Sequence, residues 1–339
     1  MDPLTHTLTA LTLSRAATPR LAAPSTLALL VAANVSDVDY LYAVGGAAAF
    51  YEHHHGWTHS IAGTVLLAAA TALAVRWLAR KKKPEAALSL RPLLAAAGLG
   101  AASHLLLDWT TPAGARLLWP FRSAQFRLDW FSADLWLLVV LLLGLALPAL
   151  MRLIAEEIGA RRDDRGRLRA ARVTLAACVL LTGARATLHS EALTQLDSRL
   201  FQGRTPLRSA ALPTPLNPFR WEGVVETSAT YELAEVRLAP PPAGPAGPER
   251  ASGSFTTIYK PSESPALDAA LATRTARAYL SRARFPKVEI LPAAGEGWEV
   301  RIHDLAGARP FQARIELDRE LKIVSETLFY SRANGGAER

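Results

Sequence analysis

The chain has 339 residues, of which 50% are hydrophobic, and its formal net charge at pH 7 is +8. The apolar residues exceed what a soluble domain of this size needs, and they are concentrated in residues 1–190. The basic residues accompany no zinc-finger, RNA-binding or helix-turn-helix pattern, so no nucleic-acid partner is expected. The single cysteine, Cys178, excludes a disulfide within the chain and a thiolate metal site.

The first apolar segments, Leu4–Ala17 and Leu21–Val35, predict a helical hairpin that enters a membrane without forming two full spans. A spanning helix needs roughly 20 predominantly apolar residues, and with the four later apolar segments we expect about four to six membrane helices. Pro148 lies inside the segment Leu135–Ile154 and predicts a kink in this helix rather than its end. The four segments are Ile61–Ala79, Leu93–Leu107, Leu135–Ile154 and Val173–Leu188.

Two basic blocks predict the orientation of these helices. Residues 80–91 hold five basic residues, and residues 152–172 are also strongly basic. Because short cytoplasmic loops of membrane proteins carry an excess of Lys and Arg, we expect both blocks in the cytoplasm. The opposite helix ends, and everything after Val173–Leu188, are then expected outside, as in a protein of a bacterial inner membrane with the lipid bilayer as its surroundings.

The tail has the composition of a soluble domain. Residues 191–218 predict an amphipathic helix and a Pro-rich linker, and residues 219–332 predict an extracytoplasmic α+β domain with one helix at Pro265–Arg284. The fold class is therefore a multi-pass α-helical membrane bundle, residues 1–190, with a C-terminal soluble α+β domain. The predicted strands are Trp221–Thr227, Tyr231–Leu238, Ser254–Tyr259, Lys287–Leu291, Trp298–Asp304, Gln312–Leu317 and Ile323–Phe329.

Histidines and acidic residues gather in short motifs near the N-terminus. His104 and Asp108 are four residues apart, so on a helix they share one face and can reach one metal ion. Ionisable side chains at membrane depth cost several kcal/mol unless they are paired or ligated, which favours a metal site over a structural hydrogen-bonded pair. The motifs are Asp2–His6, Asn34–Asp39, His53–Ser60 and His104–Asp108.

The expected orientation brings these motifs to one outer rim of the bundle. It places His59, His104 and Asp108 on the same side, together with Asp37, although no histidine was used to assign it. Imidazole and carboxylate ligands without thiolates are typical of zinc or a similar divalent ion. There are enough ligands for one or two ions, so the sequence predicts a metal centre at this rim.

The other polar residues of the motifs leave alternatives open. His6 can ligate a metal, or it can cap a helix or face water. In an extended stretch Asp37 and Asp39 point to opposite sides, so only one of them is needed as a ligand. His53 and His55 are expected to be solvated neighbours of the site.

Five motifs occur together within residues 1–155, and in this combination they resemble the YdjM-like inner-membrane proteins, a family described as metal-dependent hydrolases. The resemblance implies that His54 and His59 are metal ligands, whereas the family pattern has arginine at the position of His55. The motifs are Asp2-Pro3-Leu4-Thr5-His6, Asp37-Val38-Asp39, His54-His55-Gly56-Trp57-Thr58-His59-Ser60, Ser103-His104-Leu105-Leu106-Leu107-Asp108 and Leu117-Leu118-Trp119-Pro120-Phe121.

The His-x-x-x-Asp helix is also distantly similar to zinc-dependent phospholipase C and P1-type nucleases, which implies a helical metal-site core and a phosphate-ester substrate. We therefore expect a membrane-embedded zinc hydrolase that acts on an ester or phosphodiester, with a lipid-derived substrate favoured by its position. Asp37 or Asp39 is the expected catalytic carboxylate that assists a metal-bound water. The alternatives are a metal transporter or sensor, and a non-enzymatic membrane scaffold whose tail binds a partner.

Overall fold

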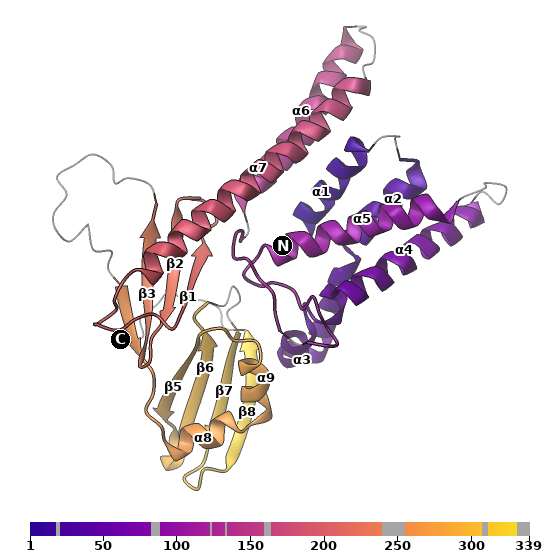
Figure 1. Cartoon of the computed structure of the whole chain (residues 1–339). Helices are drawn as coiled ribbons and strands as arrows, with labels where there is room; N and C mark the ends of the chain where they lie inside the picture. Colours follow the sequence, from indigo (N-terminus) through magenta and orange to yellow (C-terminus); the bar gives the residue numbers. More distant parts are fainter. Residues whose placement is uncertain are drawn as a thin grey trace, which may run out of the picture. The chain divides into compact units, whose positions relative to one another are not determined.

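The computed structural model describes residues 1–17, 21–82, 89–122, 124–132, 134–158, 164–238, 255–306 and 311–330. The chain divides into two compact units (Figure 1). The first unit contains Met1–Asp39 and His55–Thr187, and the second contains Tyr40–His54 and Leu188–Arg339.

The first unit is helical. Helix α2 contacts α4 and α5, and α1 contacts α2, α5 and α6 (Figure 1). Within the described residues, α4, α5, α6 and α7 are long and apolar enough to cross a membrane, and α2 with the bent segment Val35–His53 adds a fifth candidate. Helix α6 continues through Pro148, as predicted. The main helices are α1 (Pro3–Ala16), α2 (Ala23–Ala32), α4 (Ile61–Lys82), α5 (Leu90–Trp109), α6 (Leu135–Glu157) and α7 (Asp164–Asp197), of which α7 continues into the second unit.

The helix contacts of the first unit use small side chains, while large apolar side chains are exposed. Ala28 and Ala32 of α2 pack with Ala72 of α4 and with Ala97 and Ala101 of α5. A lipid environment favours this distribution, because helices in lipid associate through close packing of small residues. The exposed leucines of α6 include Leu142, Leu143, Leu147, Leu150 and Leu153.

Arg185 interrupts the apolar part of α7, and a carboxylate of the same unit compensates its charge. Its Nη2 atom lies 2.9 Å from Oδ2 of Asp134, and both side chains are buried. Asp134 also accepts hydrogen bonds from the backbone N–H groups of Trp136 and Leu137, so it caps the N-terminus of α6. Pairing of this kind is what makes a charged side chain tolerable in a membrane helix.

The described residues of the second unit form two antiparallel sheets of four strands each, and in both sheets the strand order follows the chain. Helix α8 packs on β6 and β7, and α9 packs on β7 and β8 (Figure 1). The N-terminal helices are thus followed by a β-sheet region, as predicted. The elements are β1 (Arg208–Pro213), β2 (Arg220–Glu226), β3 (Thr230–Arg237), β4 (Phe255–Tyr259), α8 (Pro265–Leu271), α9 (Arg274–Leu280), β5 (Pro286–Pro292), β6 (Trp298–Asp304), β7 (Phe311–Leu317) and β8 (Ile323–Tyr330).

Three details of the tail differ from the sequence pattern. The amphipathic helix is the end of α7, which runs without a break to Asp197 and packs Leu196 on the first sheet. Strand β1 lies within the segment that reads as a Pro-rich linker, because its order comes from pairing with β2. The single helix expected over Pro265–Arg284 is two helices, since the Thr273 side chain accepts the N–H of Ala276 and starts α9.

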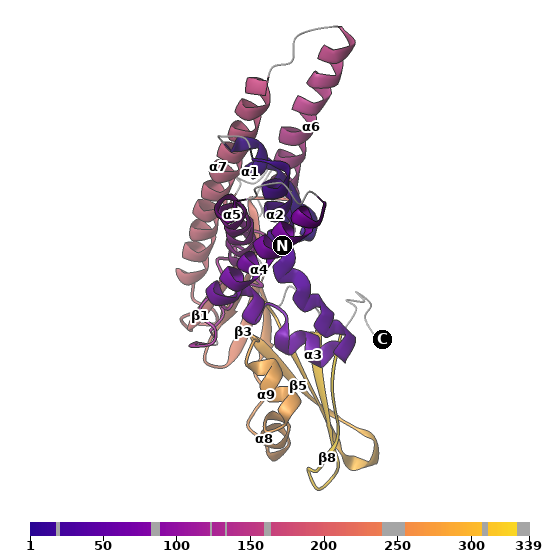
Figure 2. The same cartoon turned by 90° about the vertical axis from the view of Figure 1, so that its right-hand side faces the viewer.

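The segment Tyr40–His54 belongs to the second unit although it lies early in the chain. It contains α3 (Gly46–His53), which contacts β8 and α9 (Figure 2). The ring of Tyr51 stacks on Tyr279 with a centroid distance of 5.0 Å, and the ring of Phe50 lies 6.1 Å from that of Phe311. These aromatic residues join the core of the second sheet.

Candidate metal centre

The motif Asp2–His6 forms the start of α1. The Asp2 carboxylate accepts hydrogen bonds from the backbone N–H of Thr5 at 2.9 Å and from its hydroxyl at 2.7 Å, which caps the helix. Pro3 occupies the first turn, where its missing N–H costs no hydrogen bond. With the helix start fixed in this way, His6 lies on the buried side of α1 and has no exposed surface.

Asp37 and Asp39 follow α2 on a 3-10 helix, Val35–Gly45, and not on the extended stretch that was expected. Residues two positions apart on a 3-10 helix are separated by about 240° around its axis, because the helix has 3.0 residues per turn. The two carboxylates therefore approach a common neighbour from different sides. That neighbour is His59, which Asp37 faces at Nε2 and Asp39 faces at Nδ1.

His104 and Asp108 lie one helical turn apart at the end of α5, and both are fully buried. Helix α5 is very close to α2 at Gly100, where an added Cβ would lie 2.2 Å from the carbonyl oxygen of Leu29. This approach lets Nδ1 of His104 donate a hydrogen bond of 2.8 Å to the carbonyl oxygen of Ala33 at the end of α2.

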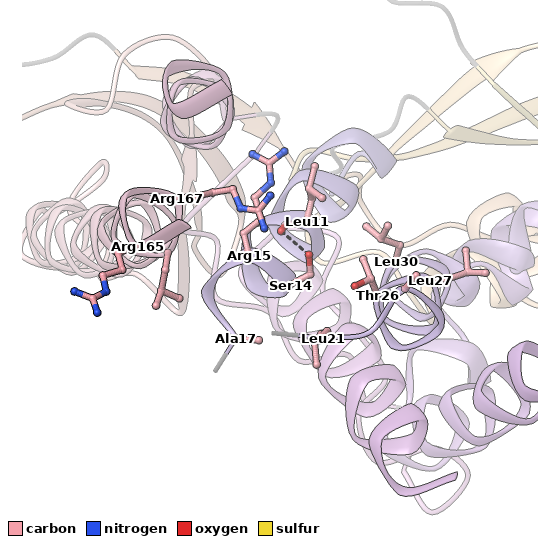
Figure 3. A pocket seen from close by; sticks show the side chains of 12 residues that line it. Leu11, Ser14, Arg15, Ala17, Leu21, Thr26, Leu27, Leu30, Arg165 and Arg167 are labelled. Atoms are coloured by element: carbon pink, nitrogen blue, oxygen red, sulfur yellow. Dashed lines mark hydrogen bonds between the residues drawn. The ribbon is translucent and has the colours of Figure 1, made fainter. Parts of the chain in front are cut away.

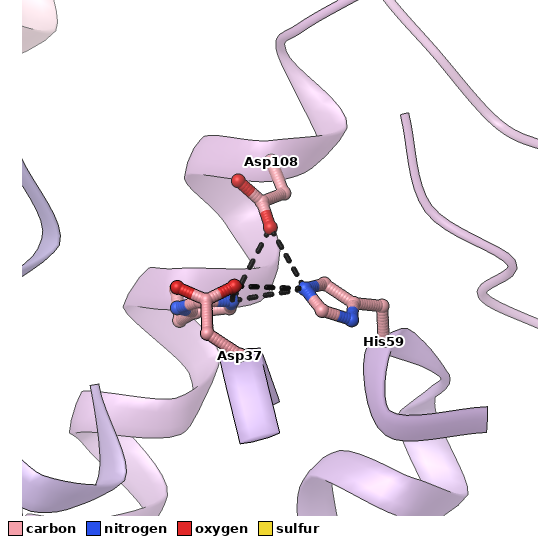
Figure 4. Close-up of side chains that lie close together, drawn as sticks. Asp37, His59 and Asp108 are labelled. Carbon is pink, nitrogen blue, oxygen red and sulfur yellow. Dashed lines mark hydrogen bonds and ion pairs between the residues drawn. The ribbon is translucent and has the colours of Figure 1, made fainter. Parts of the chain in front are cut away.

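Four side chains from three elements converge (Figure 4): Asp37, His59, His104 and Asp108. The Nε2 atoms of the two histidines are 3.1 Å apart, and they lie 3.1 and 3.2 Å from Oδ2 of Asp108. Oδ1 of Asp37 lies 3.7 and 3.8 Å from the same nitrogens. The four ligand atoms all lie within 4.8 Å of one another.

Hydrogen bonds on the far side of each imidazole fix the position of its proton. The carbonyl oxygen of Ala33 can only accept, so Nδ1 of His104 is the donor. Nδ1 of His59 lies 3.2 Å from Oδ2 of Asp39 and is the donor there for the same reason. When both rings are neutral, both Nε2 atoms are acceptors that face each other and a carboxylate oxygen. Such a group of acceptors is unfavourable unless a cation lies among them.

The distances within this group fit a four-coordinate metal ion. A tetrahedron with metal–ligand bonds of about 2.0–2.1 Å has edges of about 3.3 Å. The five distances given above run from 3.1 to 3.8 Å and bracket this value. The sixth pair, Asp37 and Asp108, lies within 4.8 Å, so the four atoms could together hold one metal ion.

Three carboxylates act on the ring of His59. Burial lowers the pKa of His59, but hydrogen bonds with Asp108, Asp37 and Asp39 raise it to about 10. The three carboxylates therefore favour a positive charge at the ring of His59. A metal ion bound here would take the place of a proton on this ring, because a ligating imidazole must be neutral.

His6 approaches the other oxygen of Asp108. Its Nε2 lies 3.3 Å from Oδ1, and its ring stacks on His104 with a centroid distance of 4.0 Å. The α-amino group of Met1 also donates to Oδ1. Asp108 thus presents Oδ2 to the group of four and Oδ1 to His6, as a carboxylate that bridges two cations does.

His55 is buried and is not the solvated neighbour that was expected. Its Nδ1 donates a hydrogen bond of 2.7 Å to the carbonyl oxygen of Gly114, and its Nε2 lies 3.9 Å from Oδ2 of Asp108. Its backbone N–H donates to Asp39, as does the hydroxyl of Thr58. Thr58 was missed by the sequence reasoning, although it directly precedes His59 in the histidine motif.

His53 and His54 lie in the second unit. The ring of His54 stacks on Phe50 with a centroid distance of 4.5 Å and meets the edge of Tyr40 at 4.6 Å. His54 is not part of the group of four. His53 is exposed, as expected.

The first unit is thus a helical membrane protein with a buried histidine and aspartate cluster at one end of its helices. The model of the YdjM inner membrane protein family matches residues 1–189, which is more than half of the chain, and the chain belongs to this family. The match includes every residue of the cluster and ends within α7. Comparisons with curated proteins and with solved structures gave no match.

Replacing Gly100 by valine tests the close contact that positions His104. We expect Gly100→Val to push α2 away from α5, to break the hydrogen bond to Ala33 and to lower the free energy of unfolding by about 1–3 kcal/mol. Thermal unfolding in mild detergent measures this change. Gly98→Val is the matched control, because an added Cβ at Gly98 meets no atom within 4 Å. Equal melting temperatures for the two variants would contradict the expected contact.

Proposed function

We propose that Asp37, His59, His104 and Asp108 bind a divalent metal ion, with zinc as the expected ion. The convergence of two imidazole nitrogens and two carboxylate oxygens carries this proposal. It is supported by the outer hydrogen bonds, because metal-binding histidines usually donate their second N–H to a carboxylate or a carbonyl group. Imidazole and carboxylate ligands without thiolates suit zinc and similar divalent ions.

A second ion has a natural place beside the first. His6 and Oδ1 of Asp108 lie 3.3 Å apart, and an ion there would take the place of the Met1 α-amino group that donates to this oxygen. A bridging Asp108 with His6 on the second ion would give the two-ion centre that the number of ligands predicts. His54 stays a ligand prediction that rests on the family motif alone.

The proposed activity is hydrolysis of an ester or phosphodiester. A divalent ion bound here would lower the pKa of a coordinated water toward neutrality. Asp37 is the member of the group that substrate can reach, since its side chain is 13% exposed whereas that of Asp108 is 1% exposed. We therefore assign the catalytic proton acceptor to Asp37. Asp39 is buried against His59 and Thr58 and acts as a positioning residue.

The surroundings of the centre favour a lipid-derived substrate. Large apolar side chains one or two positions from the cluster residues in the chain are exposed, and the cluster lies at the end of helices that are apolar enough to span a membrane. A substrate with an acyl chain could contact these side chains while its ester or phosphate group reaches Asp37. The exposed residues are Leu4, Val38, Ile61 and Leu106.

Two other functions use the same residues differently. A metal transporter needs ligands along a path through the helices, whereas the described residues contain one such group, and it lies at one end. A sensor would bind metal reversibly without turnover. A scaffold would keep its function when the histidines are removed, so the experiments below separate these cases from a hydrolase.

Metal analysis tests the centre itself. Protein purified in mild detergent without chelator is expected to carry about one equivalent or more of a transition metal, and His104→Ala with Asp108→Ala is expected to lose at least about 90% of it. His53→Ala is the control, since it removes an exposed histidine of the same motif. Asp37→Asn is a milder variant in case the double variant does not fold. The site would be excluded if the wild-type protein carried less than about 0.3 equivalents of transition metal and if this content were the same in the double variant and in Asp37→Asn.

Turnover of chromogenic phosphodiesters and esters, and of phospholipids in mixed micelles, tests the activity. Asp37→Asn is expected to lower kcat by about 10²-fold or more, because it removes both a proposed metal ligand and the proton acceptor. Chelation should abolish turnover and added zinc should restore it, while His53→Ala should match the wild-type protein. Turnover that survives chelation, or full activity of Asp37→Asn, would reject this mechanism.

We also propose that the metal centre and the C-terminal region lie outside the cytoplasm. Arg80, Lys81, Lys82 and Arg91 lie at the ends of α4 and α5 that are opposite to the cluster, and basic residues favour the cytoplasmic side. In a Cys178→Ser background, Glu320→Cys should react with a membrane-impermeant maleimide in intact spheroplasts. Lys82→Cys should react only after lysis. The reverse labelling pattern would invert the proposed topology.

A further inference from the structure

The first unit contains a cavity of about 780 Å³ between the end of α1, the start of α2 and the first turns of α7 (Figure 3). This volume falls in the range of about 300–1,000 Å³ that is typical of pockets for small molecules. Leucine side chains from all three helices form apolar walls, and arginines add positive charge. The lining includes Leu11, Arg15, Leu21, Leu30, Arg167 and Leu168.

The charged side chains that are described in the lining of this cavity are all basic. Arg165 and Arg167 reach the cavity from α7, and Arg15 reaches it from α1. Arg15 and Arg167 line the same cavity and lie near each other (Figure 3). None of the described residues that line the cavity is acidic, and no described carboxylate forms an ion pair with Arg15 or Arg167.

Arg15 is partly buried, so its charge gains from a partner. Its Nη1 donates a hydrogen bond of 3.3 Å to the carbonyl oxygen of Leu145, near the middle of the 23-residue helix α6. Helices α6 and α7 continue beyond the end of α1 (Figure 1). A partly buried guanidinium group beside a membrane helix is stabilised by a partner of opposite charge. An anion in the cavity would supply that partner.

The cavity lies at the opposite end of the first unit from the metal centre. Helix α1 runs from His6 at the centre to Arg15 at the cavity, and α2 runs from the cavity to the centre. The same end carries Arg80 at the end of α4 and Arg91 at the start of α5. The 20 residues of α5 correspond to about 30 Å between the two ends. A ligand in the cavity therefore does not touch the metal ligands.

We propose that this cavity binds an anionic phospholipid, with the headgroup phosphate on Arg15 and Arg167 and an acyl chain along the leucines. Guanidinium groups bind phosphate oxygens through paired, charge-assisted hydrogen bonds. Basic pockets between membrane helices recognise anionic headgroups in this way. The leucine walls favour a lipid over a free phosphate ion, because an inorganic anion would make no apolar contact with them.

The proposal is tested with the full-length protein, delipidated in detergent and titrated with dioleoyl-phosphatidylglycerol, with dioleoyl-phosphatidylcholine or with inorganic phosphate. Binding is followed by thermal shift and by native mass spectrometry. We expect one molecule of phosphatidylglycerol to bind at least about tenfold more tightly than phosphatidylcholine, since two arginines contact its charge. Phosphate alone should give no comparable shift at millimolar concentration. Equal affinity for the two lipids, or an equal effect of phosphate alone, would overturn the proposal.

Two double variants with the same loss of charge locate the site. Arg15→Gln with Arg167→Gln should reduce the affinity for phosphatidylglycerol by about tenfold or more, measured against the unliganded variant. Arg80→Gln with Lys82→Gln removes two exposed charges from α4 at the same end and should leave the affinity unchanged. Equal losses in both variants would mean that general surface charge, not the cavity, attracts the lipid. Arg15→Lys with Arg167→Lys keeps the charge and serves if the glutamine variant does not fold.

Discussion

The burial of one carboxylate among apolar helices is the constraint on which the first unit depends. Asp108 has no exposed surface, and a charge in such surroundings has to be compensated by partners that the fold brings to it. Its Oδ2 atom meets the nitrogens of His59 and His104, while its Oδ1 atom meets His6 and the α-amino group of Met1. Separate segments of the chain therefore end at one side chain, and their packing is tied to its electrostatics.

This convergence requires helices that approach each other more closely than large side chains would allow. Gly100 brings the backbone of α5 against that of α2, and the carbonyl oxygen of Ala33 can then hold the ring of His104. Small residues at helix contacts are also how helices associate in lipid, where leucine gains nothing by leaving the bilayer. The same packing thus leaves large apolar side chains on the outside of the bundle, where lipid can contact them, and fixes the orientation of a polar cluster on the inside.

The parts of this arrangement that follow from local periodicity could be predicted from the sequence. Hydropathy marks the apolar helices, and the four-residue spacing places His104 and Asp108 on one face. The role of Asp39 could not be predicted in this way, because it depends on a 3-10 helix whose pattern reads equally well as an extended stretch. Nor could the burial of His55, since it is set by the carbonyl oxygen of Gly114, 59 residues away. Strand β1 could not be predicted for the same reason, because its order depends on pairing with β2.

The segment Tyr40–His54 connects the second unit to the candidate metal site through the covalent chain. The residue before this segment is Asp39 and the residue after it is His55, and both contact His59. The segment itself packs Tyr51 into the core of the second sheet. The family match contains this segment but ends at residue 189, before the sheet on which it packs. In this chain the tail therefore provides the core on which Phe50 and Tyr51 pack, and these two residues belong to a segment that begins and ends beside the cluster.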